Sequence, residues 1–154
     1  MFISGVVSVS FRPNSVEEII NAAKNANLSL IEWGSDVHSP AGDTLLAEKI
    51  SKLRIFSDEN GKMNLSVKDV SGKALIVSNF TLNANYSHGN RPDYFNSAPP
   101  AEAEQLYEYF KAELQKRDIF CASGVFGADM RTEMSTDGPV TIVMDSKVLL
   151  GGKI

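Results

Sequence analysis

Two short segments of this 154-residue chain carry residue types that could bind a substrate and act on it. In the first, residues 78–82, hydroxyl and amide side chains directly follow the most apolar stretch of the sequence. In the second, residues 136–141, a Gly138-Pro139 pair leads into a strand-like run. An X-Pro bond is the one common place for a cis peptide, and glycine lets other atoms approach the backbone closely. The alternative for the second segment is an ordinary turn before an edge strand.

The sequence lacks the patterns of the common catalytic and metal sites. Its two histidines, His38 and His88, are far apart, and it has no CxxC or HExxH motif, so we expect no metal ion and no cofactor. It also has no phosphate-binding or dinucleotide-binding glycine motif and no Gly-x-Ser-x-Gly motif. Ser87 beside His88 indicates a surface turn rather than a catalytic pair. The single cysteine, Cys121, indicates a buried small side chain rather than a nucleophile.

The elements that must position the two segments follow from the hydrophobic pattern. Residues 74–77 are four consecutive apolar residues, which predicts a central strand, buried on both faces, that continues to Leu82. The polar stretch 83–98 predicts a long loop, and loops of that length in compact domains are usually functional or mobile. Pro99 and Pro100 then open a predicted helix. Its expected buried stripe is Ala103, Leu106, Tyr107, Phe110 and Leu114.

The remaining elements complete a mixed domain. Further strands are predicted at residues 3–11, 28–33, 119–125, 130–136 and 139–145. A capping box at Ser15 predicts a helix to about Asn27. A cap at Asp43 predicts a second helix, which residues 58–61 break and whose apolar face is Leu46, Ile50 and Leu53. The order of elements predicts one α/β (α+β mixed) domain over residues 1–154.

Composition limits the class of protein. The chain is 43% hydrophobic and 22% charged, as globular domains are, and a single cysteine suits a reducing compartment. No apolar run approaches the ~18–20 residues of a membrane span, and the first residues do not resemble a secretory signal. A net charge of −4 disfavours DNA binding by charge alone, although basic side chains gather between residues 49 and 73. We therefore expect a cytoplasmic protein with neither DNA nor membrane as partner.

Six segments, in order, resemble the D-aminoacyl-tRNA deacylase family. They include Ile-Val-Ser-Asn-Phe-Thr-Leu at 76–82, Phe-Gly-Ala-Asp-Met at 126–130 and Asp-Gly-Pro-Val-Thr at 137–141. The other three are residues 53–67, Gly89 with Arg91-Pro92, and residues 98–100. The resemblance covers residues 45–145, whereas residues 1–44 match poorly because a predicted helix stands where the family has a hairpin.

The resemblance implies a fold and an activity. The fold is a mixed sheet with flanking helices in a homodimer. The activity is hydrolysis of the ester bond of D-aminoacyl-tRNA, and of mischarged glycyl-tRNA, at the 3′ acceptor end, which serves chiral proofreading in translation. The catalytic segment would be Ser78, Asn79, Phe80 and Thr81. Main-chain N–H groups around Phe80 and Thr81 would hold the ester carbonyl as an oxyanion hole does.

The resemblance also implies how D and L substrates are told apart. In the family the Gly-Pro bond is cis and enters the active site of the other subunit. Gly138 and Pro139, with Thr136 beside them, would then form a chiral filter that leaves no room for an L side chain. Met130 would line the same pocket.

The chemistry requires little from side chains. An aminoacyl ester is already activated, and the terminal ribose supplies a neighbouring 2′-hydroxyl, so positioning and charge stabilisation would provide most of the catalysis. Thr81 has no adjacent base in the sequence, which favours an orienting role over a covalent one; the role of nucleophile remains the alternative.

Departures from the family pattern keep other functions open. Asn79 stands where the family has glutamine, Thr136 stands where it has asparagine, and residues 1–7 lack the family's arginine. These differences motivate an alternative, a diverged paralogue that binds tRNA or a protein partner with little or no deacylase activity. A third reading is an esterase on small esters, which a trans Gly138-Pro139 bond would favour.

Overall fold

The computed structural model describes residues 2–4, 6–9, 28–33, 40–135 and 140–151. Its strands are β1 (Phe2–Ser4), β2 (Val6–Val9), β3 (Leu28–Trp33), β4 (Phe56–Ser57), β5 (Met63–Leu65), β6 (Lys73–Ser78), β7 (Phe120–Ser123), β8 (Thr132–Ser135) and β9 (Ile142–Val143). Its helices are α2 (Pro40–Lys52), the 3₁₀ turn η1 (Phe80–Asn83), α3 (Pro100–Gln115) and α4 (Ser146–Leu149). Among these residues, no helix is long and apolar enough to cross a bilayer.

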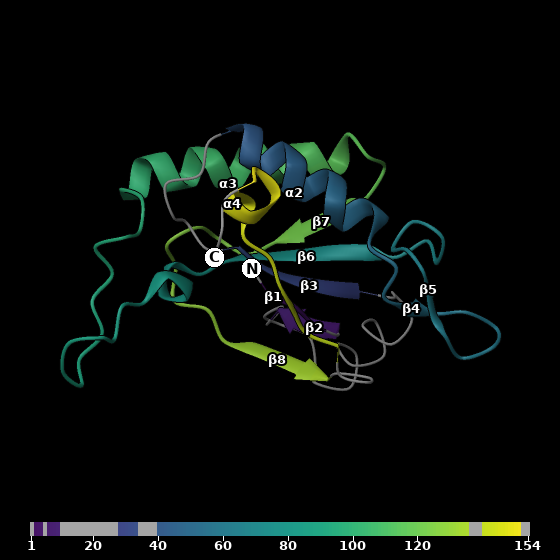
Figure 1. The fold of residues 1–154 in the computed structure, drawn as a ribbon, viewed down its shortest axis with the longest axis horizontal. Helices are drawn as coiled ribbons and strands as arrows, with labels where there is room; N and C mark the ends of the chain where they lie inside the picture. Colours follow the sequence, from purple (N-terminus) through teal and green to yellow (C-terminus); the bar gives the residue numbers. More distant parts are fainter. Residues whose placement is uncertain (1, 5, 10–27, 34–39, 136–139, 152–154) are drawn as a thin grey trace.

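A mixed five-stranded sheet organises the domain. Its strand order is β7-β6-β3-β1-β9, with β6 parallel to both β3 and β7 and with β1 antiparallel to β3 and β9. Helices α2, α3 and α4 lie on one side of this sheet, and the pair formed by β2 and β8 lies on the other (Figure 1). The predicted mixed sheet with flanking helices is therefore confirmed.

The central strand β6 is buried on both faces, as its apolar run predicts. The prediction that it continues to Leu82 is wrong, because β6 ends at Ser78 and Asn79 caps the 3₁₀ turn η1 there. Ala74 and Ile76 belong to the main core under the helices, whereas Leu75 and Val77 pack on the other face with Ala122 and Met130. The predicted buried face of α3 is confirmed, and it packs on this core. All five of its residues are buried: Ala103, Leu106, Tyr107, Phe110 and Leu114.

Three expectations about the other elements are wrong, each for a local reason. The predicted strand 3–11 is two strands, because β1 joins the main sheet while β2 pairs with β8. Asp43 does not cap α2: the helix begins at Pro40, which suits a first turn, and Asp43 is fully buried in it. Residues 58–61 end no helix but form the turn of the β4–β5 hairpin, where the Asp58 carboxylate accepts the Lys62 N–H.

Two more predicted elements lie nearer the ends of the chain. The strand predicted at 139–145 is limited to β9 and is followed by α4, whose first turn the Asp145 carboxylate caps by accepting the Lys147 N–H. The predicted helix from Ser15 to Asn27 lies outside the described residues.

Tyr107 ties α3 to the backbone of β6. Its hydroxyl donates to the Ile76 carbonyl at 2.8 Å, two residues before Ser78, and burial raises the pKa of the Tyr107 phenol to about 12. Removing the hydroxyl leaves a buried carbonyl short of a donor. We therefore expect Tyr107→Phe to lower the free energy of unfolding by ~1–2 kcal/mol. The melting temperature should fall by about 2–8 °C in thermal unfolding.

Tyr109 provides the matched control for this substitution. Its hydroxyl meets Thr44 Oγ1 at 2.9 Å between α2 and α3, but the pair is only partly buried, so water can replace the lost partner. Tyr109→Phe should change stability by less than ~0.5 kcal/mol. Equal losses of stability in Tyr107→Phe and Tyr109→Phe would contradict the claim that the buried Tyr107 hydrogen bond stabilises the fold more than the Tyr109 hydrogen bond does.

Candidate active site

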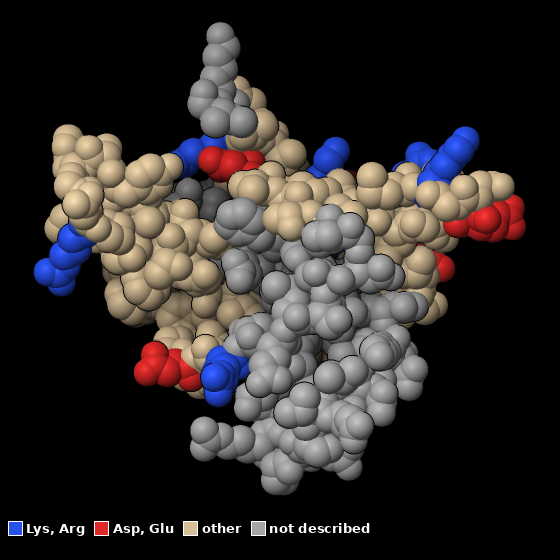
Figure 2. Space-filling model, turned by 90° about the horizontal axis from the view of Figure 1, so that it is seen from below, with Lys and Arg blue, Asp and Glu red and all other residues tan. Residues whose placement is uncertain are grey.

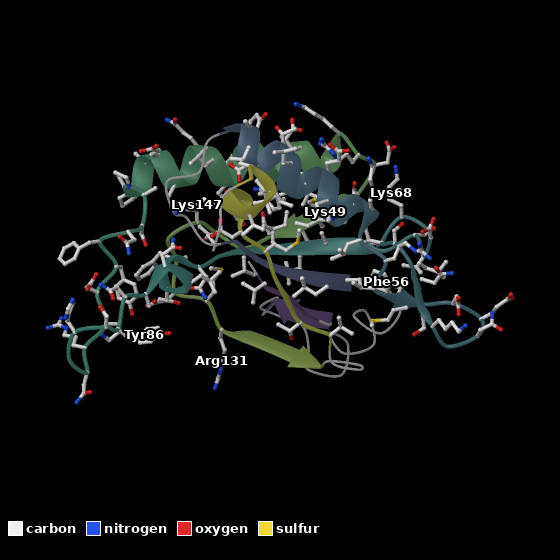
Figure 3. All side chains as sticks on the ribbon, in the orientation of Figure 1. Lys49, Phe56, Lys68, Tyr86, Arg131 and Lys147 are labelled. Atoms are coloured by element: carbon white, nitrogen blue, oxygen red, sulfur yellow. The ribbon has the colours of Figure 1, made fainter. Side chains whose placement is uncertain are left out.

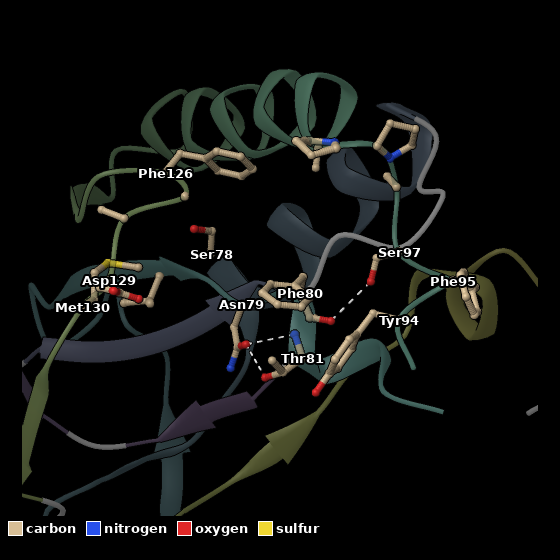
Figure 4. Close-up of a pocket in the computed structure, with 17 residues that line it drawn as sticks. Ser78, Asn79, Phe80, Thr81, Tyr94, Phe95, Ser97, Phe126, Asp129 and Met130 are labelled. Carbon is tan, nitrogen blue, oxygen red and sulfur yellow. Dashed lines mark hydrogen bonds between the residues drawn. The ribbon is translucent and has the colours of Figure 1, made fainter. Parts of the chain in front are cut away.

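A pocket of about 950 Å³ opens where β6 ends. Three segments that are far apart in the sequence form its walls: residues 77–81, residues 94–100 with Ala103, and residues 126–130. In Figure 4, Asn79, Phe80 and Thr81 lie between Tyr94 and Ser97 on one side and Asp129 and Met130 on the other. The pocket is at the upper end of the usual size for small-molecule sites and lies beyond the carboxyl end of a parallel strand, a common place for them.

Asn79 forms the cap that begins the turn η1. Its Oδ1 atom accepts the Thr81 N–H at 3.0 Å and also accepts the Thr81 hydroxyl hydrogen. An asparagine at this place is a preferred cap because its short side chain reaches the second N–H of the turn. The segment that the sequence singles out is therefore a built turn at the end of the central strand.

This cap decides which donors face the pocket. The Thr81 N–H is already bonded to Asn79, and the Thr81 hydroxyl donates to an amide oxygen, which is not a base. Phe80 is the first residue of η1, so its N–H has no acceptor within that turn. Of the two main-chain N–H groups expected at an oxyanion hole, Phe80 carries the more accessible one in this conformation.

Phe80 also anchors the second wall. Its ring meets the Tyr94 ring edge-on, with centroids 4.9 Å apart, and its carbonyl accepts the Ser97 hydroxyl at 3.3 Å. These two contacts hold the loop before α3 against η1. Sequence reasoning missed Tyr94, Phe95 and Ser97 as pocket residues, although the length of the loop that contains them was a signal.

Met130 lines the third wall and packs against the Leu75 and Val77 face of β6. Gly124 makes room for it, because a Cβ at Gly124 would collide with the Met130 sulfur. The structure thus brings together Ser78, Asn79, Phe80, Thr81 and Met130 around one pocket. The other three predicted site residues, Thr136, Gly138 and Pro139, lie outside the described residues.

The pocket has almost no titratable side chains. Asp129 is the one charged residue among the described residues that line it, and no histidine or cysteine lies there. In the described ranges, no three His, Cys, Asp or Glu side chains gather as a metal site would require. Burial raises the pKa of Cys121 to about 11, which keeps this thiol protonated at neutral pH. Ser87 donates its hydroxyl to Asn85, as in an ordinary turn.

Three of the six basic residues between 49 and 73 have polar partners within the described part of the chain. Lys52 bonds Glu48, Lys68 meets Asp118, and Arg54 donates to the Asn64 carbonyl. On the described part of the face seen in Figure 2, Lys and Arg are scattered, with acidic neighbours at the end that carries β4 and β5. This region does not form a continuous cationic surface on that face.

Comparisons with known proteins agree with this architecture. A family model described as D-Tyr-tRNA(Tyr) deacylase matches residues 8–145. A D-aminoacyl-tRNA deacylase of Ruegeria pomeroyi is 57% identical over 100 residues, which cover 65% of this chain and 69% of that protein. One of Koribacter versatilis is 54% identical over 129 residues, which cover 84% of this chain and 86% of that protein.

Solved structures extend the similarity to the fold. A "c-Myc DNA Unwinding Element Binding Protein" superposes with a TM-score of 0.72 at 30% identity, covering 92% of this chain and 94% of that chain. A "probable eukaryotic D-amino acid tRNA deacylase" superposes with a TM-score of 0.65 at 13% identity, covering 92% and 98%, and shows likeness of fold alone. The family match begins at residue 8, well before the first of the six segments noted above.

Proposed function

Because the chain belongs to the D-Tyr-tRNA(Tyr) deacylase family, we propose that it hydrolyses the ester bond of D-aminoacyl-tRNA. The products are a free D-amino acid and a tRNA with its terminal hydroxyl restored. The observation that carries the proposal is the pocket at the end of β6, which gathers the family segments 78–81 and 126–130 around one space. A tRNA substrate is the reason to place the enzyme in the cytoplasm.

The proposed chemistry fits a pocket without an activated nucleophile. Water adds to the ester carbonyl carbon, the bond from that carbon to the ribose oxygen breaks, and the ribose oxygen leaves with a proton. The neighbouring 2′-hydroxyl of the substrate orients the water and relays the proton. The Phe80 N–H stabilises charge on the carbonyl oxygen, since a preorganised main-chain donor acts strongly in a site shielded from water.

Thr81 serves to shape the turn rather than to attack the ester. Its hydroxyl hydrogen is directed at Asn79 Oδ1, and an amide oxygen cannot accept that proton as a base would. Thr81 and Asn79 together fix the main chain that carries the Phe80 N–H. In this account Ser78 ends the strand and Asn79 is a positioning residue.

Chiral selection is proposed to come from main-chain oxygens of a second copy of the chain. Gly138 and Pro139, with Thr136 beside them, would face the α-carbon of the substrate in the partner subunit of a homodimer. Carbonyl oxygens there would clash with an L side chain, whereas a D side chain would point elsewhere. Glycine has no side chain to exclude, so glycyl-tRNA would also be hydrolysed.

The direct test compares D-tyrosyl-tRNA with L-tyrosyl-tRNA and follows release of the amino acid. A steric clash of the usual size for overpacking predicts that the D ester is hydrolysed about 10- to 100-fold faster. Equal rates for the D and L esters would contradict the proposed chiral filter. Tight tRNA binding without release of either amino acid would favour the alternative of a paralogue that binds tRNA without turnover.

A further inference from the structure

Phe95 is the most exposed large apolar side chain among the described residues. Phe95 as a residue is 92% exposed, yet it lies on the rim of the pocket rather than on a remote surface. Figure 4 draws its ring beyond Tyr94, on the wall opposite Met130. An aromatic ring so placed contributes nothing to the core, and burying it in a complex would be favourable. A bound ligand that covers the Phe95 ring would explain this exposure.

The loop holds Phe95 in this outward position. The Phe95 N–H donates to the Asp93 carboxylate at 3.3 Å, and Asp93 is paired with Asn85 by two main-chain hydrogen bonds of 2.9 and 3.0 Å. On the other side, the Ser97 N–H donates to the Tyr94 carbonyl at 3.0 Å, and the Tyr94 ring packs on Phe80. The main chain is fixed on both sides of Phe95 while its ring remains in solvent.

The surroundings of Phe95 suit a nucleic acid strand. The segment between η1 and α3 extends away from the layers of the domain, as the teal-green loop in Figure 1 shows. Arg91 is exposed on the same loop, and no ion pair within the described part of the chain neutralises it. Proteins commonly bind single-stranded nucleic acids with aromatic rings on which bases stack, combined with basic side chains that meet the phosphates.

We propose that Phe95 is a stacking platform for a base of the single-stranded CCA end of the tRNA. This inference rests on the proposed function, which supplies an aminoacylated 3′ end whose ester must reach Asn79 and Thr81. The unpaired end has to cross the pocket rim on its way, and Phe95 is more exposed there than Phe80, the other exposed phenylalanine of the lining. Arg91 would meet a phosphate of the same strand.

The experiment measures binding rather than turnover. Two uncharged RNA hairpins are compared by fluorescence anisotropy, one ending in single-stranded CCA and one ending blunt. The wild-type protein should bind the CCA hairpin more tightly. Phe95→Ala should weaken binding of the CCA hairpin roughly 10- to 100-fold and leave the blunt hairpin unchanged. Phe95→Trp should retain the preference, and stacking should quench the new fluorescence.

Two variants control for less specific effects. Phe95→Leu keeps an apolar side chain without a ring and should lose the preference for CCA as Phe95→Ala does. Tyr86 lies on the same loop and is 79% exposed, but it does not line the pocket. Tyr86→Ala should therefore retain the preference for the CCA hairpin. Figure 3 shows Tyr86 on this loop. Equal losses in the Tyr86 and Phe95 variants, or a preference that survives Phe95→Ala, would overturn the proposal.

Parallel assays separate this inference from the proposed function. If the wild-type enzyme deacylates D-tyrosyl-tRNA but Phe95→Ala binds both hairpins as the wild type does, only the platform is wrong. If the preference for CCA depends on Phe95 while no aminoacyl ester is hydrolysed, the stacking role of Phe95 is confirmed and the proposed deacylase function is contradicted. A Phe95→Ala effect on oligomeric state in sedimentation, in place of an effect on RNA binding, would also overturn the platform.

Discussion

Replacing the terminal 2′-hydroxyl of D-tyrosyl-tRNA with hydrogen should slow release of D-tyrosine by ~10²–10⁴-fold, the usual contribution of a positioned proton-transfer group. The expectation follows from the side chains around the pocket. The Thr81 hydroxyl donates to an amide oxygen, and no histidine or cysteine is among the residues that line the pocket in the described part of the chain. Apart from the Asp129 carboxylate on the wall of Met130, the proposed relay for the proton is therefore the substrate's own hydroxyl.

The measurement uses tRNA that ends in 2′-deoxyadenosine and carries the amino acid on its 3′-oxygen. Single-turnover rates with saturating enzyme separate chemistry from binding. The matched control places the deoxy sugar at the preceding nucleotide, where it should change the rate little. A loss smaller than about threefold with the terminal deoxy substrate would show that the protein itself supplies the proton relay.

Asn79→Ala should lower kcat/KM for D-tyrosyl-tRNA by about 100-fold. Without the cap, the Thr81 N–H and hydroxyl both lose their acceptor, and the turn that carries the Phe80 N–H can shift. Displacing a catalytic donor by about 1 Å is enough for a loss of this size. The same change should reduce stability by only ~0.5–2 kcal/mol, as removal of a helix cap does.

Two further variants distinguish capping from other roles of this segment. Asn79→Asp keeps an oxygen that can accept both hydrogen bonds, so its activity should stay within about tenfold of the wild type. Thr81→Val should also stay within about tenfold, because the main-chain bond to Asn79 remains. A loss on the order of 10⁶ in Thr81→Val, as enzymes show when a covalent nucleophile is removed, would instead make Thr81 the nucleophile.

The sequence predicts best where the hydrophobic pattern is strong. Residues 74–77 are apolar in succession and α3 has a clear helical stripe, so the central strand and the helix over it follow from burial alone. The predicted start of α2 failed at Asp43 because the same residue type suits a cap and a buried first turn. Strands as short as β4 carry too few residues for a periodic signal.

In the candidate site, too, some residues could be predicted from the sequence and others could not. Residues 78–81 and Met130 belong to motifs, and the structure places them around one pocket. The wall formed by Tyr94, Phe95 and Ser97 has no motif, because its place depends on contacts with Phe80 that join residues distant in the sequence. The length of the loop marks it as functional but does not say which of its side chains face the substrate.

The topology of the sheet has a consequence for synthesis on the ribosome. Strand β6 pairs with β3, which emerges earlier, and with β7, which emerges only after α3. A nascent chain that ends before β7 therefore exposes one edge of its most apolar strand. Translation must proceed through residue 130 before all three walls of the pocket exist, so a chain released earlier would be both inactive and prone to aggregate.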